Sequence, residues 1–140
     1  MTDHDSDVDF MFVQAACGMF RPIGDETREY DTGDLPDRDG DGFSLFVSPH
    51  GSYRFRRRVR FHNGHTLVVA ALQIVSRDGI NGQIAQVYTL HALRRHGYAR
   101  ELLAHARTRF QTILHSKDLS DAGRLWAIAV DGPNFKQVQS

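Results

Sequence analysis

The sequence predicts a single α/β domain, in which several β-strands in the middle of the chain lead into an amphipathic helix. Apolar and polar residues alternate from Ser52 to His62, which is the pattern of a half-buried strand. Apolar residues recur every three or four positions from Arg100 to Leu114, which is the pattern of an amphipathic helix. A chain of 140 residues buries roughly 70% of its unfolded surface. We therefore expect one domain over residues 10–140, preceded by a disordered acidic tail over residues 1–9.

Turn-forming residues divide the domain into its expected elements. Phe10 to Phe20 is compatible with either a strand or a short helix, and residues 21–42 are predicted to form a loop because they are rich in Pro, Gly and Asp. The elements expected after this loop are strands over 43–48, 52–62, 65–75 and 82–90, the helix over 100–114, and a last strand over 125–130.

A hairpin is expected between the second and third of these strands. Asn63 and Gly64 both tolerate the positive φ of a type I′ turn, so they are predicted to join the strands and to place His62 opposite His65. Two imidazoles at this position would resemble half of a metal site, but no third ligand lies nearby. We therefore predict no metal ion.

Composition narrows the class of protein. Cys17 is the only cysteine, so an internal disulfide is excluded, and the acidic N-terminus lacks the pattern of a secretory signal. No apolar run reaches the ~20 residues of a membrane span. A cytoplasmic protein is therefore expected.

Charge is distributed unevenly along the chain. Residues 1–42 carry twelve acidic residues and three arginines, a net charge of −9, whereas residues 43–140 carry +9. The acidic part could cover a basic surface, mimic an anionic partner, or serve as a solubilising tail.

The strand expected over 52–62 has two different faces. Alternation places Arg54, Arg56, Arg58 and Arg60 on one face, which is expected to be a solvated outer face, and the aromatic residues on the other. This separation argues against nucleic-acid binding, which places stacking aromatics beside phosphate contacts.

The segment Arg94-Arg95-His96-Gly97-Tyr98-Ala99 lies between an apolar strand and the amphipathic helix. A Gly-containing turn at this point leaves backbone N–H groups exposed at a helix N-terminus, beside two guanidinium groups. This arrangement predicts a binding site for phosphate or diphosphate.

The order of these elements resembles the central part of the GNAT family, the acetyl-CoA-dependent N-acetyltransferases. The family's phosphate turn has Arg or Gln, two residues, Gly, one residue, and then Gly or Ala; Arg94, Gly97 and Ala99 stand at that spacing. The paired leucines that follow in the family are matched by Leu102 and Leu103. The alternating apolar residues before the turn are matched by Val87 and, less well, by Thr89, and an Asn after the next strand by Asn134. The resemblance extends over about residues 67–134.

The resemblance implies a mixed, mostly antiparallel sheet flanked by helices, an α/β (α+β) fold. It also implies an acetyl-CoA-dependent N-acyltransferase that acts on an amine, a small molecule or a protein. The coenzyme's diphosphate would bind the turn, and its pantetheine arm would pair with the preceding strand. The residues that the resemblance assigns to the coenzyme are Thr89, Leu90, Arg94, Arg95, His96, Gly97, Tyr98, Ala99 and Asn134.

Catalytic groups are less evident. The family often places a Glu on the strand before the turn, whereas this chain has Gln83, Gln86 and Tyr88 there. His91 is therefore the candidate base and Tyr88 the candidate proton donor.

The chain also looks C-terminally shortened, because the family's fourth helix, its final strand pair and its acid Tyr have no expected counterpart. An alternative is therefore a non-catalytic, GNAT-like interaction protein, such as the virion-associated proteins of bacteriophages. An incomplete sheet with an open edge would favour a homo-oligomer.

Overall fold

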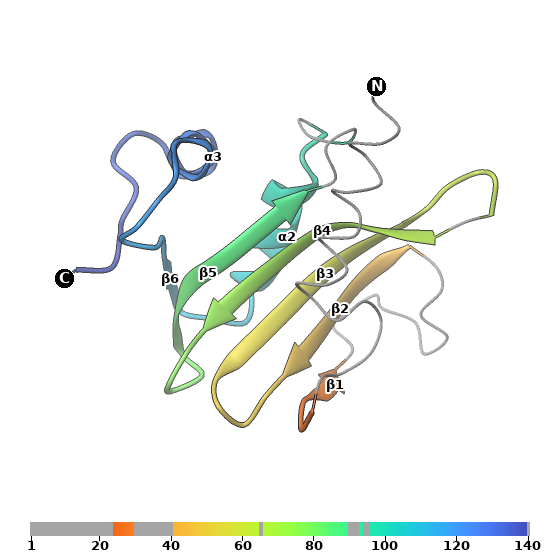
Figure 1. Ribbon diagram of the computed structural model, residues 1–140, viewed down its shortest axis with the longest axis horizontal. Helices are drawn as coiled ribbons and strands as arrows, with labels where there is room; N and C mark the ends of the chain where they lie inside the picture. Colours follow the sequence, from red (N-terminus) through yellow and green to blue (C-terminus); the bar gives the residue numbers. More distant parts are fainter. Residues whose placement is uncertain (1–23, 30–40, 65, 90–92, 94–95, 140) are drawn as a thin grey trace.

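The computed structural model describes residues 24–29, 41–64, 66–89, 93 and 96–139, and the predictions for residues 1–23 lie outside this part of the chain. A six-stranded sheet dominates the fold, with its strands in sequence order (Figure 1). Adjacent strands from β1 to β5 pair antiparallel with one another, and β6 is parallel to β5. The strands are β1 (Thr27–Glu29), β2 (Gly42–Val47), β3 (Ser52–Arg60), β4 (Thr66–Val75), β5 (Asn81–Thr89) and β6 (Thr112–Leu114). The mixed, mostly antiparallel sheet is confirmed, and β2 to β5 begin and end within two residues of their predicted limits.

The main core lies between the sheet and helix α2 (Tyr98–Ala106), which covers one face of the sheet (Figure 1). Leu45, Phe55 and Leu72 point from β2, β3 and β4 toward this helix and are at most 1% exposed. Leu102 and Leu103 of α2 pack against them. The predicted apolar stripe of the helix is therefore buried, which stabilises both the helix and the sheet.

The helix is shorter than predicted. It ends at Ala106, where the N–H groups of Thr108 and Arg109 bond to carbonyl groups three residues back and tighten the last turn. Phe110 and Ile113 are buried, as the spacing predicted, but they follow the helix, and Ile113 belongs to β6. The periodicity thus identified core residues correctly and assigned the last ones to the wrong element.

A second helix, α3 (Asp121–Asp131), replaces the strand predicted over 125–130. Ser120 caps its N-terminus by accepting a hydrogen bond from the N–H of Gly123 at 3.0 Å, and Gly132 ends it with a φ of 85°. Leu125 is 69% exposed and Ile128 is 37% exposed, because only one side of this apolar run faces the protein. The prediction of a strand over 125–130 is therefore wrong.

The face of β3 that carries Arg54, Arg56, Arg58 and Arg60 is not solvated as a whole. The prediction is wrong for Arg54, Arg56 and Arg58. These residues are 3%, 0% and 0% exposed, and of the four only Arg60 is exposed. Arg54 forms a two-pronged ion pair with Glu26, with 2.7 Å between Nε and Oε2. The Arg56 Nε donates to the hydroxyl of Ser44 at 3.1 Å.

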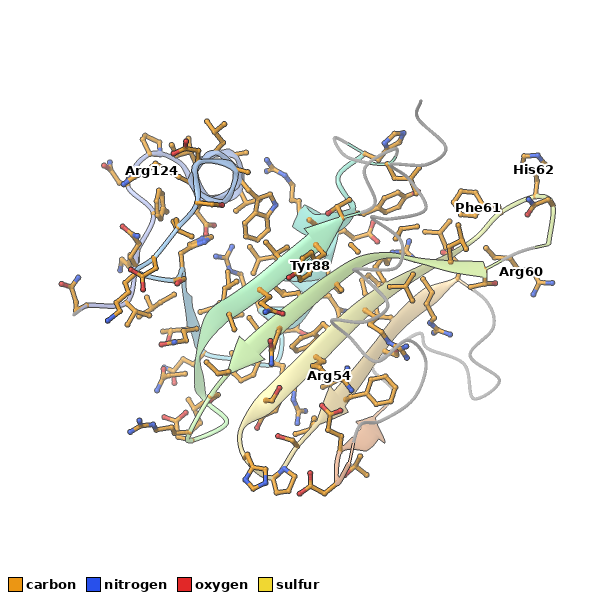
Figure 2. The ribbon with its side chains drawn as sticks, viewed as in Figure 1. Arg54, Arg60, Phe61, His62, Tyr88 and Arg124 are labelled. Atoms are coloured by element: carbon orange, nitrogen blue, oxygen red, sulfur yellow. The ribbon has the colours of Figure 1, made fainter. Side chains whose placement is uncertain are left out.

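The hairpin turn begins one residue earlier than predicted. The N–H of Gly64 donates to the carbonyl of Phe61 at 2.9 Å, so His62 and Asn63 are the central residues of the turn. Figure 2 shows Arg60, Phe61 and His62 at this end of the hairpin, away from α3. His65, the expected neighbour of His62, lies outside the described residues. Among the described residues, no group of three or more His, Cys, Asp or Glu side chains is placed to hold a metal ion.

Candidate functional site

The sheet opens between β5 and β6. The two strands pair only through Asn81–Gln83 and Thr112–Leu114, and no described strand pairs with this side of β5 beyond Gln83. A β-bulge contributes to the divergence, because Ala85 is an extra residue between the pairs that Ile84 and Gln86 form with β4. Alternate backbone groups of β5 therefore face the gap rather than a neighbouring strand.

A cavity of about 840 Å³ occupies this opening. It is lined by residues 84–89 of β5, by residues 97–100 at the start of α2, and by His115, Ser116 and one side of α3. Trp126 and Val130 of α3 form part of its apolar wall. The cavity thus extends from the edge of β5 to the beginning of α2.

Gly97 lines the cavity directly before the first residue of α2. It precedes α2 with a φ of 82°, which a residue with a side chain rarely adopts, and apart from its chain neighbours no described atom lies within 4 Å of where a Cβ would stand. In the described part of the chain, no group accepts a hydrogen bond from the N–H of Tyr98, Ala99 or Arg100. These N–H groups and the helix dipole form a positively polarised end where an anion is stabilised.

Five of the residues predicted from the sequence line this one cavity: Tyr88, Thr89, Gly97, Tyr98 and Ala99. Figure 2 shows Tyr88 on β5.

The other predicted residues are placed differently. The ring of His96 is stacked on Tyr98, and its Nδ1 lies 3.0 Å from the carbonyl of Leu93, whereas Asn134 is exposed in the turn after α3; neither is among the lining residues. The predictions for Leu90, His91, Arg94 and Arg95 lie outside the described residues.

A buried histidine that the sequence analysis did not single out also lines the cavity. His115 is 1% exposed, and its Nε2 lies 2.6 Å from Oδ2 of Asp131. Arg107 donates two hydrogen bonds to the same carboxylate, at 2.8 and 2.6 Å. The rings of Trp126 and Phe135 pack edge-on against the imidazole.

The charge of Asp131 is stabilised by its neighbours. The hydrogen bonds from Arg107, followed by that from His115, hold the pKa of the Asp131 carboxyl below its usual range, against the opposing effect of burial. Asp131 is therefore a carboxylate at neutral pH and acts only as a hydrogen-bond acceptor.

The sequence matches no family model and no curated protein. Among solved structures, it is similar to an aminoglycoside acetyltransferase from an uncultured soil metagenomic sample, crystallised with sisomicin. That comparison has a TM-score of 0.50 and 12% sequence identity, and covers all of this chain and 90% of the other. The complex of the same enzyme with trehalose gives a TM-score of 0.49 and 13% identity over the same shares of the two chains.

No helix in the described part of the chain is both long and apolar enough to cross a membrane. The strand order, the opening between β5 and β6, and the similarity to a solved acetyltransferase all agree with the resemblance seen in the sequence. The chain has the fold of the GNAT acetyltransferases.

Proposed function

We propose that the chain binds an acyl-coenzyme A, acetyl-CoA in the first instance, in the cavity between β5 and α3 and transfers its acyl group to an amine. The observation that carries this proposal is the continuity of the cavity from Gly97 to the open edge of β5. One end can hold an anion, and the rest can hold an extended arm.

The residues of the cavity suit the parts of such a coenzyme. The N–H groups at the start of α2 would bind the diphosphate, for which Arg94 and Arg95 remain predicted partners. The pantetheine arm carries two amide groups, which would hydrogen-bond as an added strand does to the edge of β5 that no described strand pairs with beyond Gln83. Trp126 and Val130 provide an apolar wall for its alkyl segments. When bound, the coenzyme supplies the activated thioester.

The reaction also requires two proton transfers. A neutral amine loses a proton as it forms the amide, and the leaving thiolate gains one. Tyr88, a residue that lines the cavity, is the proposed donor, and His91 is the base proposed from the sequence. Sisomicin, which the solved acetyltransferase holds in its crystal structure, is one amine to test, together with spermidine and a lysine-containing peptide.

Calorimetric titration with acetyl-CoA tests the binding site. Gly97→Glu places a carboxylate at the proposed diphosphate position, so we expect its Kd to rise at least about tenfold. The matched control is Gly64→Glu, because Gly64 also has a positive φ of 90° and open space around its Cβ position, but lies in the hairpin far from the cavity. The control adds the same charge and similar backbone strain and should bind acetyl-CoA like the wild type.

The titration has clear opposing outcomes. Failure of the wild-type chain to bind acetyl-CoA contradicts the proposed function, and equal affinities of the two variants contradict the position of the diphosphate. Binding without release of free thiol in the presence of any of the three amines would favour the alternative, a non-catalytic interaction protein.

A further inference from the structure

His115 occupies the point at which β5 and β6 separate. Leu114, the residue before it, is the last residue of β6 paired with β5, opposite Gln83. Ile84 and His115 are the next residues along the two strands, and both line the cavity. The imidazole therefore lies at the narrow end of the opening.

The narrow end is also where the reactive end of a bound acyl carrier would lie. Tyr88 near the end of β5 and Tyr98 at the start of α2 pack on the same apolar cluster, so Gly97 lies near the carboxyl end of β5. An arm that runs along β5 from there toward Ile84 covers five residue steps, roughly 16 Å at the rise of a strand. With the diphosphate at Gly97, the thioester would lie toward His115.

The hydrogen bond to Asp131 determines which imidazole nitrogen can accept a proton. A carboxylate cannot donate, so Nε2 of a neutral His115 carries the hydrogen that Asp131 accepts. The lone pair is then on Nδ1, which makes no hydrogen bond with the described residues. The charged groups around the ring are Asp131 of α3 and, beyond it, Arg107; Trp126 and Phe135 provide aromatic contacts.

We propose that His115, in place of His91, is the general base of the acyl transfer, with Asp131 and Arg107 as positioning residues. The proton then returns to the thiolate from His115 and not from Tyr88. This assignment rests on the function proposed above. The amine nitrogen bonds to the thioester carbonyl carbon while its proton passes to Nδ1 of His115. The carbon–sulfur bond then breaks, and the thiolate takes the proton from the imidazolium. The products are an amide and a free thiol, and His115 returns to its neutral form.

The variant His115→Gln separates catalysis from structure. The glutamine amide can donate to Asp131 from the place of Nε2, but it has no nitrogen that titrates at the place of Nδ1. With acetyl-CoA and the most reactive of the three amines, we expect an unchanged Kd for acetyl-CoA and a fall in kcat of about 10²- to 10⁴-fold. The decline of kcat/KM toward acid pH should also disappear. His62→Gln, the same substitution at an exposed hairpin residue, should behave like the wild type.

Nitrogen NMR of the ligand-free chain tests the assignment without catalysis. Near pH 7, we expect His115 to carry its proton on Nε2, and acetyl-CoA at saturation to shift the Nδ1 resonance. Asp131→Asn should lower the fraction of the Nε2–H form and decrease kcat, with little change in the KM for acetyl-CoA.

The outcomes distinguish the two proposals. If the wild type does not bind acetyl-CoA, the proposed function and this assignment fall together. If it binds, three results would each overturn the role of His115 and leave the proposed function intact. They are a proton on Nδ1 in the ligand-free chain, an Nδ1 resonance that acetyl-CoA does not shift, and a His115→Gln variant with the wild-type pH profile.

Discussion

At the scale of single residues, Arg54 and Glu26 form an ion pair that is almost completely buried. Their side chains are 4% and 6% exposed, so both groups have lost their water. The pair lies on the sheet face opposite α2, where the guanidinium groups of Arg54 and Arg56 also stack on the ring of Phe46. Removal of one partner leaves a buried charge uncompensated, which is the costly event in such pairs.

Glu26→Gln should therefore lower the free energy of unfolding by about 3–5 kcal/mol, measured by urea denaturation. Asp25→Asn is a matched control one residue away, because Asp25 faces His50 across 3.5 Å with both side chains well exposed. It should cost no more than about 1 kcal/mol. Equal losses in the two variants would show that the burial of the Arg54 pair does not contribute to stability.

Of the candidate site, Gly97 could be predicted from the sequence and His115 could not. Gly97 could be found because its spacing from Arg94 and Ala99 is local in the sequence. His115 could not, because its partner Asp131 is sixteen residues away and the contact exists only once α3 folds against the end of β6. The buried arginines were wrongly expected in solvent, because alternation separates the two faces of a strand but does not show what covers each face.

Among the elements, the strands of the central sheet were predictable and the segments after α2 were not. In β2 to β5, apolar and polar residues alternate or the residues are continuously apolar, and turns that contain Gly separate the strands. The hydrophobic pattern and the turn residues therefore predict the same strand limits. The run Leu125 to Val130 is short and apolar, and such a run does not distinguish a strand from a helix. The cap at Ser120 and the Gly at 132 were the local signals for α3.

The turn between β2 and β3 yields a test of backbone packing. Gly51 and Gly64 have φ values of 88° and 90°, but a Cβ on Gly51 would stand 2.3 Å from the carbonyl oxygen of Ser76, whereas one on Gly64 would meet nothing. Gly64→Ala should cost about 1 kcal/mol, the conformational strain alone. Gly51→Ala should cost at least about 2 kcal/mol, because it adds the clash. Thermal denaturation of both variants measures the difference, and equal melting temperatures would contradict this account.

In the molecule as a whole, the ionic cluster of Arg107, His115 and Asp131 ties three parts of the chain together. Arg107 follows α2, His115 follows β6, and Asp131 ends α3. The cluster thus fixes the helix that forms the outer wall of the cavity, so its charge state affects both stability and the shape of the site.

Acid pH should loosen this connection. Because the folded pKa of Asp131 is lowered, its contribution to stability is complete above the pKa of the unfolded chain, near ~3.9, and is lost as pH falls toward the folded value. In Asp131→Asn, the free energy of unfolding should be lower by about 1–2 kcal/mol at pH 7, and should fall less steeply between pH 4 and 2.

Urea denaturation at several pH values measures these slopes. Some slope should remain in the variant, because hydrogen bonds from the backbone N–H groups of Asn81 and Ile80 also lower the pKa of Asp78. Identical slopes in the two proteins would contradict the contribution of Asp131.

Trp126 gives the chain a built-in optical reporter. It is the sole tryptophan in the sequence, it lines the cavity, and its indole packs against His115. Its emission spectrum should therefore respond when a molecule enters beside α3 and when the neighbouring imidazole gains a proton. Candidate acyl carriers can be screened, and the ionisation of His115 followed, by steady-state fluorescence on the unlabelled protein.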